Sequence, residues 1–269
     1  MKGLKQLNFP AFLTLIALLF VSCDSQSDSA TGSFSVWLHD APADFEEVNI
    51  FIERVEVNRN EDEEGWIVIS EPMQQFDLLE LTNGAYEVLG SAELESGTYS
   101  QIRLIVSHDD NYIVENGEQK SLFVPSGSQT GVKLNVDAEI TDGSEYVLLL
   151  DFDAERSIVQ PGQAPQPADY ILKPVIRATH LATTGNASGV VVPASARPAI
   201  YAISGSDTLS TTYSDEITGE FLLFGLSEGS YTLSFNAREP GFEILNLEEI
   251  AITPGEVTTL GEIQIPASE

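Results

Sequence analysis

The most constraining feature of the chain is a short apolar run that ends in two acids around one aromatic residue. Residues 146–153 read Tyr-Val-Leu-Leu-Leu-Asp-Phe-Asp, with Asp142-Gly143 shortly before them and Pro161 after them. A run this short, rich in Val and Leu and bounded by turn residues, indicates a strand that is buried on both faces. We therefore expect it to be the central strand of a larger β domain.

Alternation of polar and apolar residues runs through most of the chain after Ser33, and helical periodicity is almost absent. Val48, Ile50 and Ile52 alternate, and the phase then slips by one at Glu53-Arg54, which indicates a β-bulge. One short helical turn is expected where apolar residues recur every third position, at residues 73–79. Further strands are expected at residues 66–69, 99–106, 121–125, 131–136 and 170–176.

A stretch of small and polar residues, 179–189, is typical of a linker, and a second β unit follows it. Residues 199–203 are expected to pair with 207–213 across Ser204-Gly205-Ser206. About seven short strands in roughly 80 residues fit a sandwich. The sequence therefore predicts an all-β fold of two Greek-key-type β-sandwich domains in tandem, at residues 32–180 and 185–266.

The two units share the motif Leu-x-x-Gly-x-Tyr, at residues 94–99 and 226–231. The spacing resembles the tyrosine corner of Greek-key sandwiches, in which a tyrosine hydroxyl reaches back to the backbone upstream. Tyr99 and Tyr231 are therefore expected to be buried structural corners. The alternative is that two unrelated turns are each followed by a core tyrosine.

The N-terminus is typical of a targeting segment. Lys2 and Lys5 precede an apolar stretch, 9–21, that is too short to span a bilayer. Ser22-Cys23 follows and resembles a bacterial lipobox, and Cys23 is the chain's one cysteine. We expect a signal peptide at 1–22, a lipid on Cys23 and a polar tether at 23–31; the alternative is an ordinary signal peptide and a chance cysteine.

The charge balance excludes one class of partner. The chain has 12 Lys and Arg against 42 Asp and Glu. A chain this acidic repels nucleic acid, so no nucleic-acid partner is expected. The expected partners are the membrane, through lipid on Cys23, and a glycan or another envelope protein. The expected location is the bacterial cell envelope, as a lipoprotein of the outer membrane.

The inventory of reactive side chains offers little for catalysis. The three histidines lack metal-type spacing, no Gly-x-Ser-x-Gly elbow occurs, and no glycine-rich phosphate loop follows a strand. We expect no cofactor and no catalytic residue. The alternative that remains is an enzyme acting on envelope polysaccharide with Asp151 or Asp153 as its carboxylate.

Three acids are candidates for an ion site. Asp151 and Asp153 share one face of the expected strand, and Asp40 can approach them. If the three converge, they need a cation or a shared proton. The preferred alternative is that Asp153 caps the turn formed by residues 154–157.

Six segments of the first unit resemble, in order, a domain of unknown function found in bacterial envelope lipoproteins. They are residues 40–42, 78–84, 97–104, 124–126, 150–153 and 172–177. This resemblance covers about residues 31–180 and implies a β-sandwich without a known activity. The second unit is similar to a carboxypeptidase-regulatory-like domain, a transthyretin-like sandwich, on residues 189–191, 219–221 and 226–231. Such domains are accessory modules, which favours a lipid-anchored, non-catalytic binding or scaffolding protein.

Overall fold

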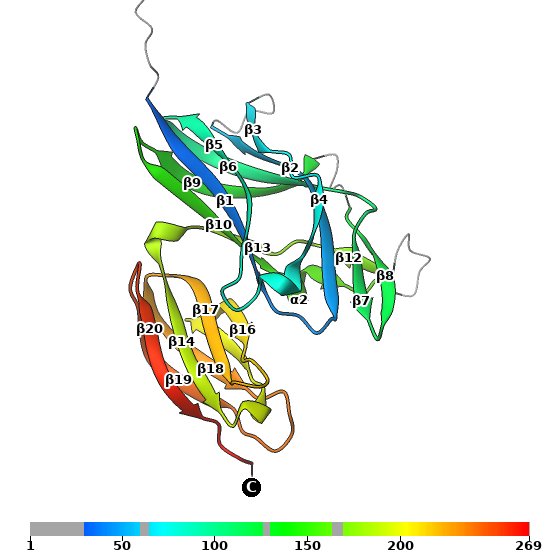
Figure 1. Ribbon diagram of the computed structural model, residues 1–269, viewed down its shortest axis with the longest axis vertical. Helices are drawn as coiled ribbons and strands as arrows, with labels where there is room; N and C mark the ends of the chain where they lie inside the picture. Colours follow the sequence, from blue (N-terminus) through cyan, green and yellow to red (C-terminus); the bar gives the residue numbers. More distant parts are fainter. Residues whose placement is uncertain (1–29, 60–64, 126–129, 163–168, 269) are drawn as a thin grey trace, which may run out of the picture.

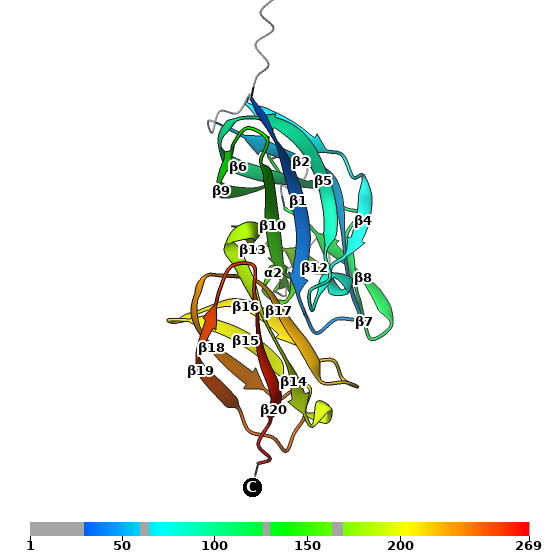
Figure 2. The ribbon, with the colours of Figure 1, turned by 60° about the vertical axis from the view of Figure 1, so that its left-hand side comes forward.

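The computed structural model describes residues 30–59, 65–125, 130–162 and 169–268. The expected signal peptide, Cys23 and most of the tether lie outside these residues. Within the described ranges, no helix is both long and apolar enough to cross a bilayer. Strands make up most of the chain and are grouped in two bodies, one above the other in Figures 1 and 2. The all-β fold with β-sandwich bodies is as predicted.

The upper body is a sandwich of two sheets. The smaller sheet has the order β13-β10-β1-β5, and its two central strands, β1 and β10, run parallel, with Trp37 opposite Leu149 and His39 opposite Asp151. Its strands are β1 (Thr31–Ala41), β5 (Glu87–Glu95), β10 (Glu145–Asp153) and β13 (Ile176–His180). A short helix, α2 (Ala154–Ser157), follows β10 directly.

The larger sheet has nine strands in the order β11-β12-β8-β7-β2-β6-β9, with β3 and β4 also paired to β2. They are β2 (Glu47–Asn58), β3 (Trp66–Ser70), β4 (Gln74–Asp77), β6 (Gly97–Val106), β7 (Tyr112–Glu115), β8 (Glu118–Phe123), β9 (Val132–Ile140), β11 (Ile158–Val159) and β12 (Tyr170–Leu172). A 3₁₀ turn, η1 (Leu78–Leu81), follows β4. One continuous apolar core fills the space between the two sheets.

The apolar run at 146–153 is β10, an inner strand of the smaller sheet, and it is buried on both faces as predicted. Leu148, Leu150 and Phe152 face the core of the sandwich. Leu149 points the other way and is still only 1% exposed. It is covered by Gly225 of the lower body, which packs so closely that a Cβ on Gly225 would lie 2.3 Å from Leu149 Cδ2.

The lower body is a second sandwich with its own apolar core. Its two sheets have the orders β17-β14-β20 and β16-β15-β18-β19. The strands are β14 (Thr184–Val192), β15 (Ala199–Ser204), β16 (Asp207–Tyr213), β17 (Glu220–Ser227), β18 (Gly229–Asn236), β19 (Leu245–Ile252) and β20 (Val257–Gln264). A 3₁₀ turn, η3 (Ala194–Ala196), lies between β14 and β15. The pairing of β15 with β16 agrees with the sequence prediction.

Three local predictions were wrong. Residues 179–189 are not a linker, because they lie in β13, the 3₁₀ turn η2 (Leu181–Thr183) and β14. Glycine is needed at position 185 because strands pack closely there: a Cβ on Gly185 would lie 2.2 Å from the carbonyl oxygen of Thr253. The stretch 170–176 is two strands in different sheets, broken beside Pro174. The expected turn at 73–79 begins only at Leu78, since β4 precedes it.

Tyr99 and Tyr231 lie at matching corners of the two sandwiches. Each hydroxyl donates to the carbonyl oxygen four residues upstream: Tyr99 to Glu95 at 3.0 Å and Tyr231 to Ser227 at 2.8 Å. Their rings belong to the two apolar cores. This is the geometry that the shared motif predicts, although only Gly97 of the two motif glycines has a positive φ, of 143°.

Candidate functional site: a cleft between the two sandwiches

The second sandwich is held against the smaller sheet of the first by directed polar contacts. Asn83 Oδ1 accepts a hydrogen bond from the backbone N–H of Leu222 at 2.6 Å. Arg177 Nη2 donates to the carbonyl oxygen of Gly225 at 3.2 Å. Asp44 forms an ion pair with Arg238. Because these contacts are spread along the junction, they fix the orientation of one sandwich against the other.

Aromatic rings complete the junction. Phe224 of β17 lies edge-on to His39, with ring centroids 5.2 Å apart, and parallel to Tyr86 at 6.3 Å. Tyr86 in turn stacks on Trp37 at 4.1 Å. His39 Nδ1 donates to the carbonyl oxygen of Ala85 at 2.7 Å, so this histidine has a structural role. Aromatic pairs of this kind add to the stability that burial gives.

Beside this junction lies a cleft with walls from both sandwiches. Its outer part has a volume of about 440 Å³ and its inner part about 130 Å³. Ala41, Asp153, Arg156 and Thr208 line both parts, so the two adjoin. The first sandwich contributes the ends of β1 and β10 together with α2, and the second contributes β15, β16 and the turn between them. Neither sandwich forms this cleft alone.

An ion pair closes the inner end of the cleft. Asp151 of β10 lies opposite Arg177 of β13, and their Oδ2 and Nη2 atoms are 2.8 Å apart. Burial raises the pKa of Asp151, while Arg177 and His39 oppose that rise. Within the described residues, Asp151 Oδ1 and the Nε and Nη1 atoms of Arg177 have no hydrogen-bond partner.

Asp40 and Asp153 serve the short helix α2. Asp153 Oδ1 accepts from the backbone N–H of Arg156 at 2.9 Å and caps the helix, which is the role that the sequence favoured. Asp40 is fully buried and accepts from the backbone N–H of Ala154 at 3.1 Å. Burial, with Asp151 as the next cause, raises the pKa of Asp40 well above its ordinary value.

The three acids that the sequence grouped as ion candidates are therefore neighbours, and each has its own structural role. Asp151 pairs with Arg177, Asp153 caps α2, and Asp40 binds the first backbone N–H of α2. Among the residues that the structure describes, no group of three or more His, Cys, Asp or Glu side chains could hold a metal ion. The strongly raised pKa of Asp40 favours a retained proton on that carboxyl over a bound cation.

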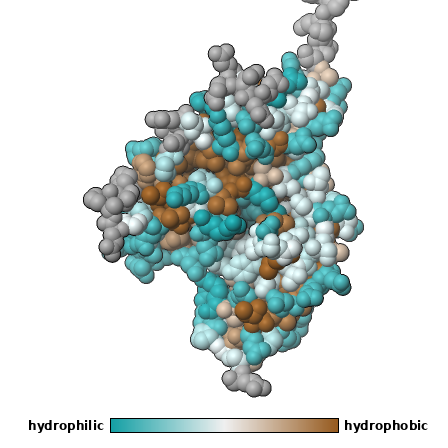
Figure 3. All heavy atoms as spheres, turned by 180° about the vertical axis from the view of Figure 1, so that it is seen from behind, coloured by the Kyte–Doolittle hydropathy of each residue, from teal (hydrophilic) through white to brown (hydrophobic). Residues whose placement is uncertain are grey.

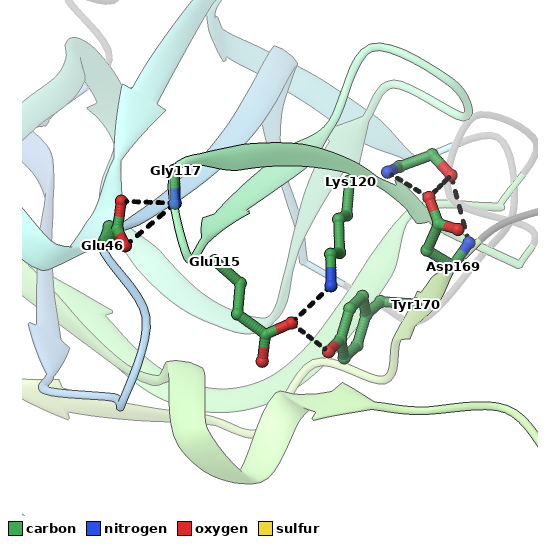
Figure 4. Close-up of polar contacts among 7 residues, drawn as sticks. Glu46, Glu115, Gly117, Lys120, Asp169 and Tyr170 are labelled. Atoms are coloured by element: carbon green, nitrogen blue, oxygen red, sulfur yellow. Dashed lines mark hydrogen bonds and ion pairs between the residues drawn. The ribbon is translucent and has the colours of Figure 1, made fainter.

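A second polar cluster joins β12 to the hairpin of β7 and β8 (Figure 4). Glu115 Oε2 accepts from Lys120 Nζ at 2.7 Å and from the hydroxyl of Tyr170 at 3.1 Å, and these bonds lower the pKa of Glu115. Asp169 accepts from the backbone N–H and the hydroxyl of Ser121, which lowers its pKa. Because each carboxylate already has partners from the chain, this cluster is a structural tie.

The outer surface of the molecule is uneven in character. Seen from behind, apolar residues gather mainly on the first sandwich, while the second shows a smaller apolar group (Figure 3). The exposed large apolar residues of the whole described chain include Val68, Met73 and Val88 on the first sandwich and Ile217 and Ile244 on the second. The cleft differs from these patches because most of its lining residues are polar or charged, although Val175, Ile176 and Leu209 give its inner part apolar surface as well.

The sequence anticipated part of this site. It singled out Asp40, Asp151 and Asp153, but not the basic partners Arg156 and Arg177 or the second wall at Thr208. Arg177 carried a usable signal, since it is one of only 12 basic residues and lies in a strand pattern. The wall at Thr208 carried none, because its contribution depends on how the sandwiches dock.

Comparison with solved structures gives low scores. The Bacillus anthracis TIE protein is 15% identical, with 88% of this chain covered and a TM-score of 0.24; the chain spans 34% of that protein's length. GBS52, the minor pilin of Streptococcus agalactiae, is 12% identical over 90% of this chain and 97% of its own, also with a TM-score of 0.24. The shaft pilin spaA of Lactobacillus rhamnosus GG is 11% identical over 89% and 99%, with a TM-score of 0.23. Similarity at this level does not extend to function.

Comparison of sequences is more informative. No curated protein matches the chain. A family model described as a domain of unknown function, DUF4382, matches residues 31–174, which include the strands of the first sandwich from β1 to β12 and the three acids Asp40, Asp151 and Asp153. Since this match spans more than half of the chain, the protein belongs to the DUF4382 family.

Proposed function

We propose that this protein is a lipid-anchored component of the bacterial cell envelope, located at the outer membrane, that binds or scaffolds another envelope component without catalysis. The observation that carries the proposal is the cleft whose walls come from two sandwiches held together by directed polar contacts. The N-terminal segment with Cys23 supports the anchor. The second sandwich serves as a carboxypeptidase-regulatory-like accessory domain that completes the cleft.

The non-catalytic reading is preferred because the candidate carboxylates are engaged. A glycoside hydrolase needs one free acid and one free base or nucleophile on opposite sides of the bond. Asp151 is tied to Arg177, and Asp153 accepts from the backbone of Arg156 while lying 3.5 Å from its guanidinium group. Carboxylates held in this way are poorly placed to exchange protons with a substrate.

The anchor is tested by detergent partitioning of Cys23→Ala expressed with its native leader. The wild-type protein is expected in the detergent phase, since acyl chains contribute about 0.8 kcal/mol per buried CH₂ group. Cys23→Ala is expected in the aqueous phase, and Ser25→Ala in the adjoining segment is the matched control. Continued partitioning of Cys23→Ala into detergent would contradict the lipoprotein assignment.

The binding role is tested by capture from native membranes. The lipidated full chain is used as bait, and the bait Thr208→Trp blocks the cleft with a bulky ring where its two parts meet. Components bound through the cleft are expected on the wild-type bait and absent from the blocked one. Equal recovery on both baits would exclude the cleft as the binding site.

A further inference from the structure

The buried ion pair in the cleft has hydrogen-bonding capacity that the chain does not use. Asp151 is 6% exposed and lines the inner part, yet its Oδ1 has no partner among the described residues. Nε and Nη1 of Arg177 lack partners as well. Buried polar atoms are nearly always paired, because leaving them unpaired destabilises the folded state. Asp40 Oδ2 also lacks a partner among the described residues, but Asp40 does not line the cleft. The other three atoms belong to the two residues at the inner end of the cleft, and a group from outside the chain reaches them when the Arg177 side chain shifts.

The unpaired atoms of Asp151 and Arg177 determine which hydrogen-bonding groups that partner must carry. Asp151 Oδ1 accepts a hydrogen bond, and Arg177 Nε–H and Nη1–H donate. A group that both donates and accepts, such as a hydroxyl, satisfies both residues at once. Arg177 can adjust to it, since its side chain is 24% exposed while that of Asp151 is 7% exposed.

The charges that line the cleft disfavour both anionic and cationic ligands. Its two parts are lined by four acids, Asp151, Asp153, Glu155 and Asp207, and by two arginines, Arg156 and Arg177. An anionic ligand would suit the arginines but would be repelled by the acids. A cation would suit the acids but would leave the free N–H groups of Arg177 unpaired. A neutral ligand rich in hydroxyl groups meets neither penalty.

The shape of the cleft fits the same class of ligand. The outer part, of about 440 Å³, falls within the usual size range of small-molecule sites. Tyr201 and Pro42 offer apolar surface there, and Thr208 and Thr211 offer hydroxyl groups. The inner part, of about 130 Å³, holds one small polar group or roughly four waters at about 30 Å³ each.

We propose that the cleft binds the end of a neutral saccharide chain, with a terminal hydroxyl or hydroxymethyl group in the inner part against Asp151 and Arg177. The adjoining sugar ring lies in the outer part, where Pro42 and Tyr201 contact its C–H groups. This inference rests on the proposed binding function and names its ligand class.

The test uses the soluble full-length Cys23→Ala protein on an array of neutral hexose oligosaccharides and length-matched uronic-acid oligosaccharides. Binding to neutral members is expected. Thr208 is exposed on β16 and lines both parts of the cleft, so Thr208→Trp fills the cleft while Asp151 and Arg177 keep their own side chains. It is expected to weaken neutral binding by about tenfold or more. Thr253 is also exposed and lies outside the cleft, so the Thr253→Trp protein should bind as the parent does.

Asp151→Asn is the second variant, and it is expected to lose saccharide binding. If Asp151→Asn does not fold, the comparison of Thr208→Trp with Thr253→Trp still tests the proposal. The proposal is overturned if no neutral saccharide binds, which would leave ordered water as the partner of the pair. It is also overturned if the uronic-acid series binds better, or if Thr208→Trp matches Thr253→Trp. Capture of a membrane component that depends on the cleft, without any saccharide binding, would overturn this inference and leave the proposed function standing.

Discussion

The two tyrosine corners allow the value of one hydroxyl to be measured twice in a single chain. Tyr99→Phe and Tyr231→Phe each remove a hydrogen bond, of 3.0 and 2.8 Å, and leave the ring in place. A typical intramolecular hydrogen bond contributes about 1 kcal/mol net to stability, and an orphaned buried partner can add about 1 kcal/mol more. We therefore expect each substitution to lower the free energy of unfolding by about 1–2 kcal/mol.

The ring should matter more than the hydroxyl. Tyr99 is fully buried and Tyr231 is 4% exposed. Truncating a large buried aromatic side chain to alanine costs about 3–5 kcal/mol, so Tyr99→Ala and Tyr231→Ala should each cost two to three times as much as the phenylalanine variants. The two tyrosines belong to separate cores, so the effects of the double variant Tyr99→Phe/Tyr231→Phe should add.

Urea unfolding, followed by circular dichroism, measures these differences. Tyr86→Phe is the control, because the ring of Tyr86 is 42% exposed and water can satisfy its hydroxyl. Its stability should match the wild type within about 0.5 kcal/mol. If Tyr99→Phe and Tyr231→Phe are as stable as this control, the corner hydrogen bonds contribute nothing and the reasoning is refuted.

Three further outcomes are expected. The raised pKa of Asp40 means that the folded state keeps its proton to higher pH than the unfolded chain, so stability falls as pH rises from the ordinary aspartate pKa to the raised one. Asp40→Asn should therefore have a higher free energy of unfolding than wild type at neutral pH, and this difference should shrink in acid. Urea midpoints of both proteins across a pH series measure the difference, and a difference that does not change with pH would contradict the reasoning. Residues 185–269 alone should unfold cooperatively, since they contain their own core, and a disordered spectrum would contradict the proposed boundary. Gly225→Ala places a methyl group against Leu149 at a positive φ of 66°, so hydrogen exchange at the junction should quicken, and unchanged exchange would refute tight docking there.

Features that depend on a few neighbouring residues were predictable from the sequence. The phase slip at Glu53-Arg54 is a break in the register between β2 and β6. Asn116-Gly117 turns the β7–β8 hairpin with φ values of 54° and 73°, as such a dipeptide favours. The alternating apolar residues at 231–235 face the second core. In each case the cause lies within about six residues of its effect.

Features caused by contact between distant segments were not predictable. Small residues at 179–189 look like a linker in sequence, yet Gly185 and Gly189 are required by strands that pass close to them. A flexible connection and a tightly packed strand use the same small side chains for opposite reasons. For the same reason the sequence indicated Asp151 and Asp153 of the cleft and missed its second wall, which comes from residues 48 to 58 positions beyond Asp153.

The burial of β10 connects the fold to the cleft. The apolar run predicts that both faces of this strand are covered, and the second face needs a cover that the first sandwich does not supply. The cover is β17 of the second sandwich, through the contact of Gly225 with Leu149. Two residues further along the same face of β10 the side chain is that of Asp151, which pairs with Arg177. At this point the second sandwich no longer covers the strand, and the cleft begins. The second sandwich is therefore required both to bury β10 and to form the cleft, so a chain that keeps the first sandwich alone should lose the binding site while exposing Leu149.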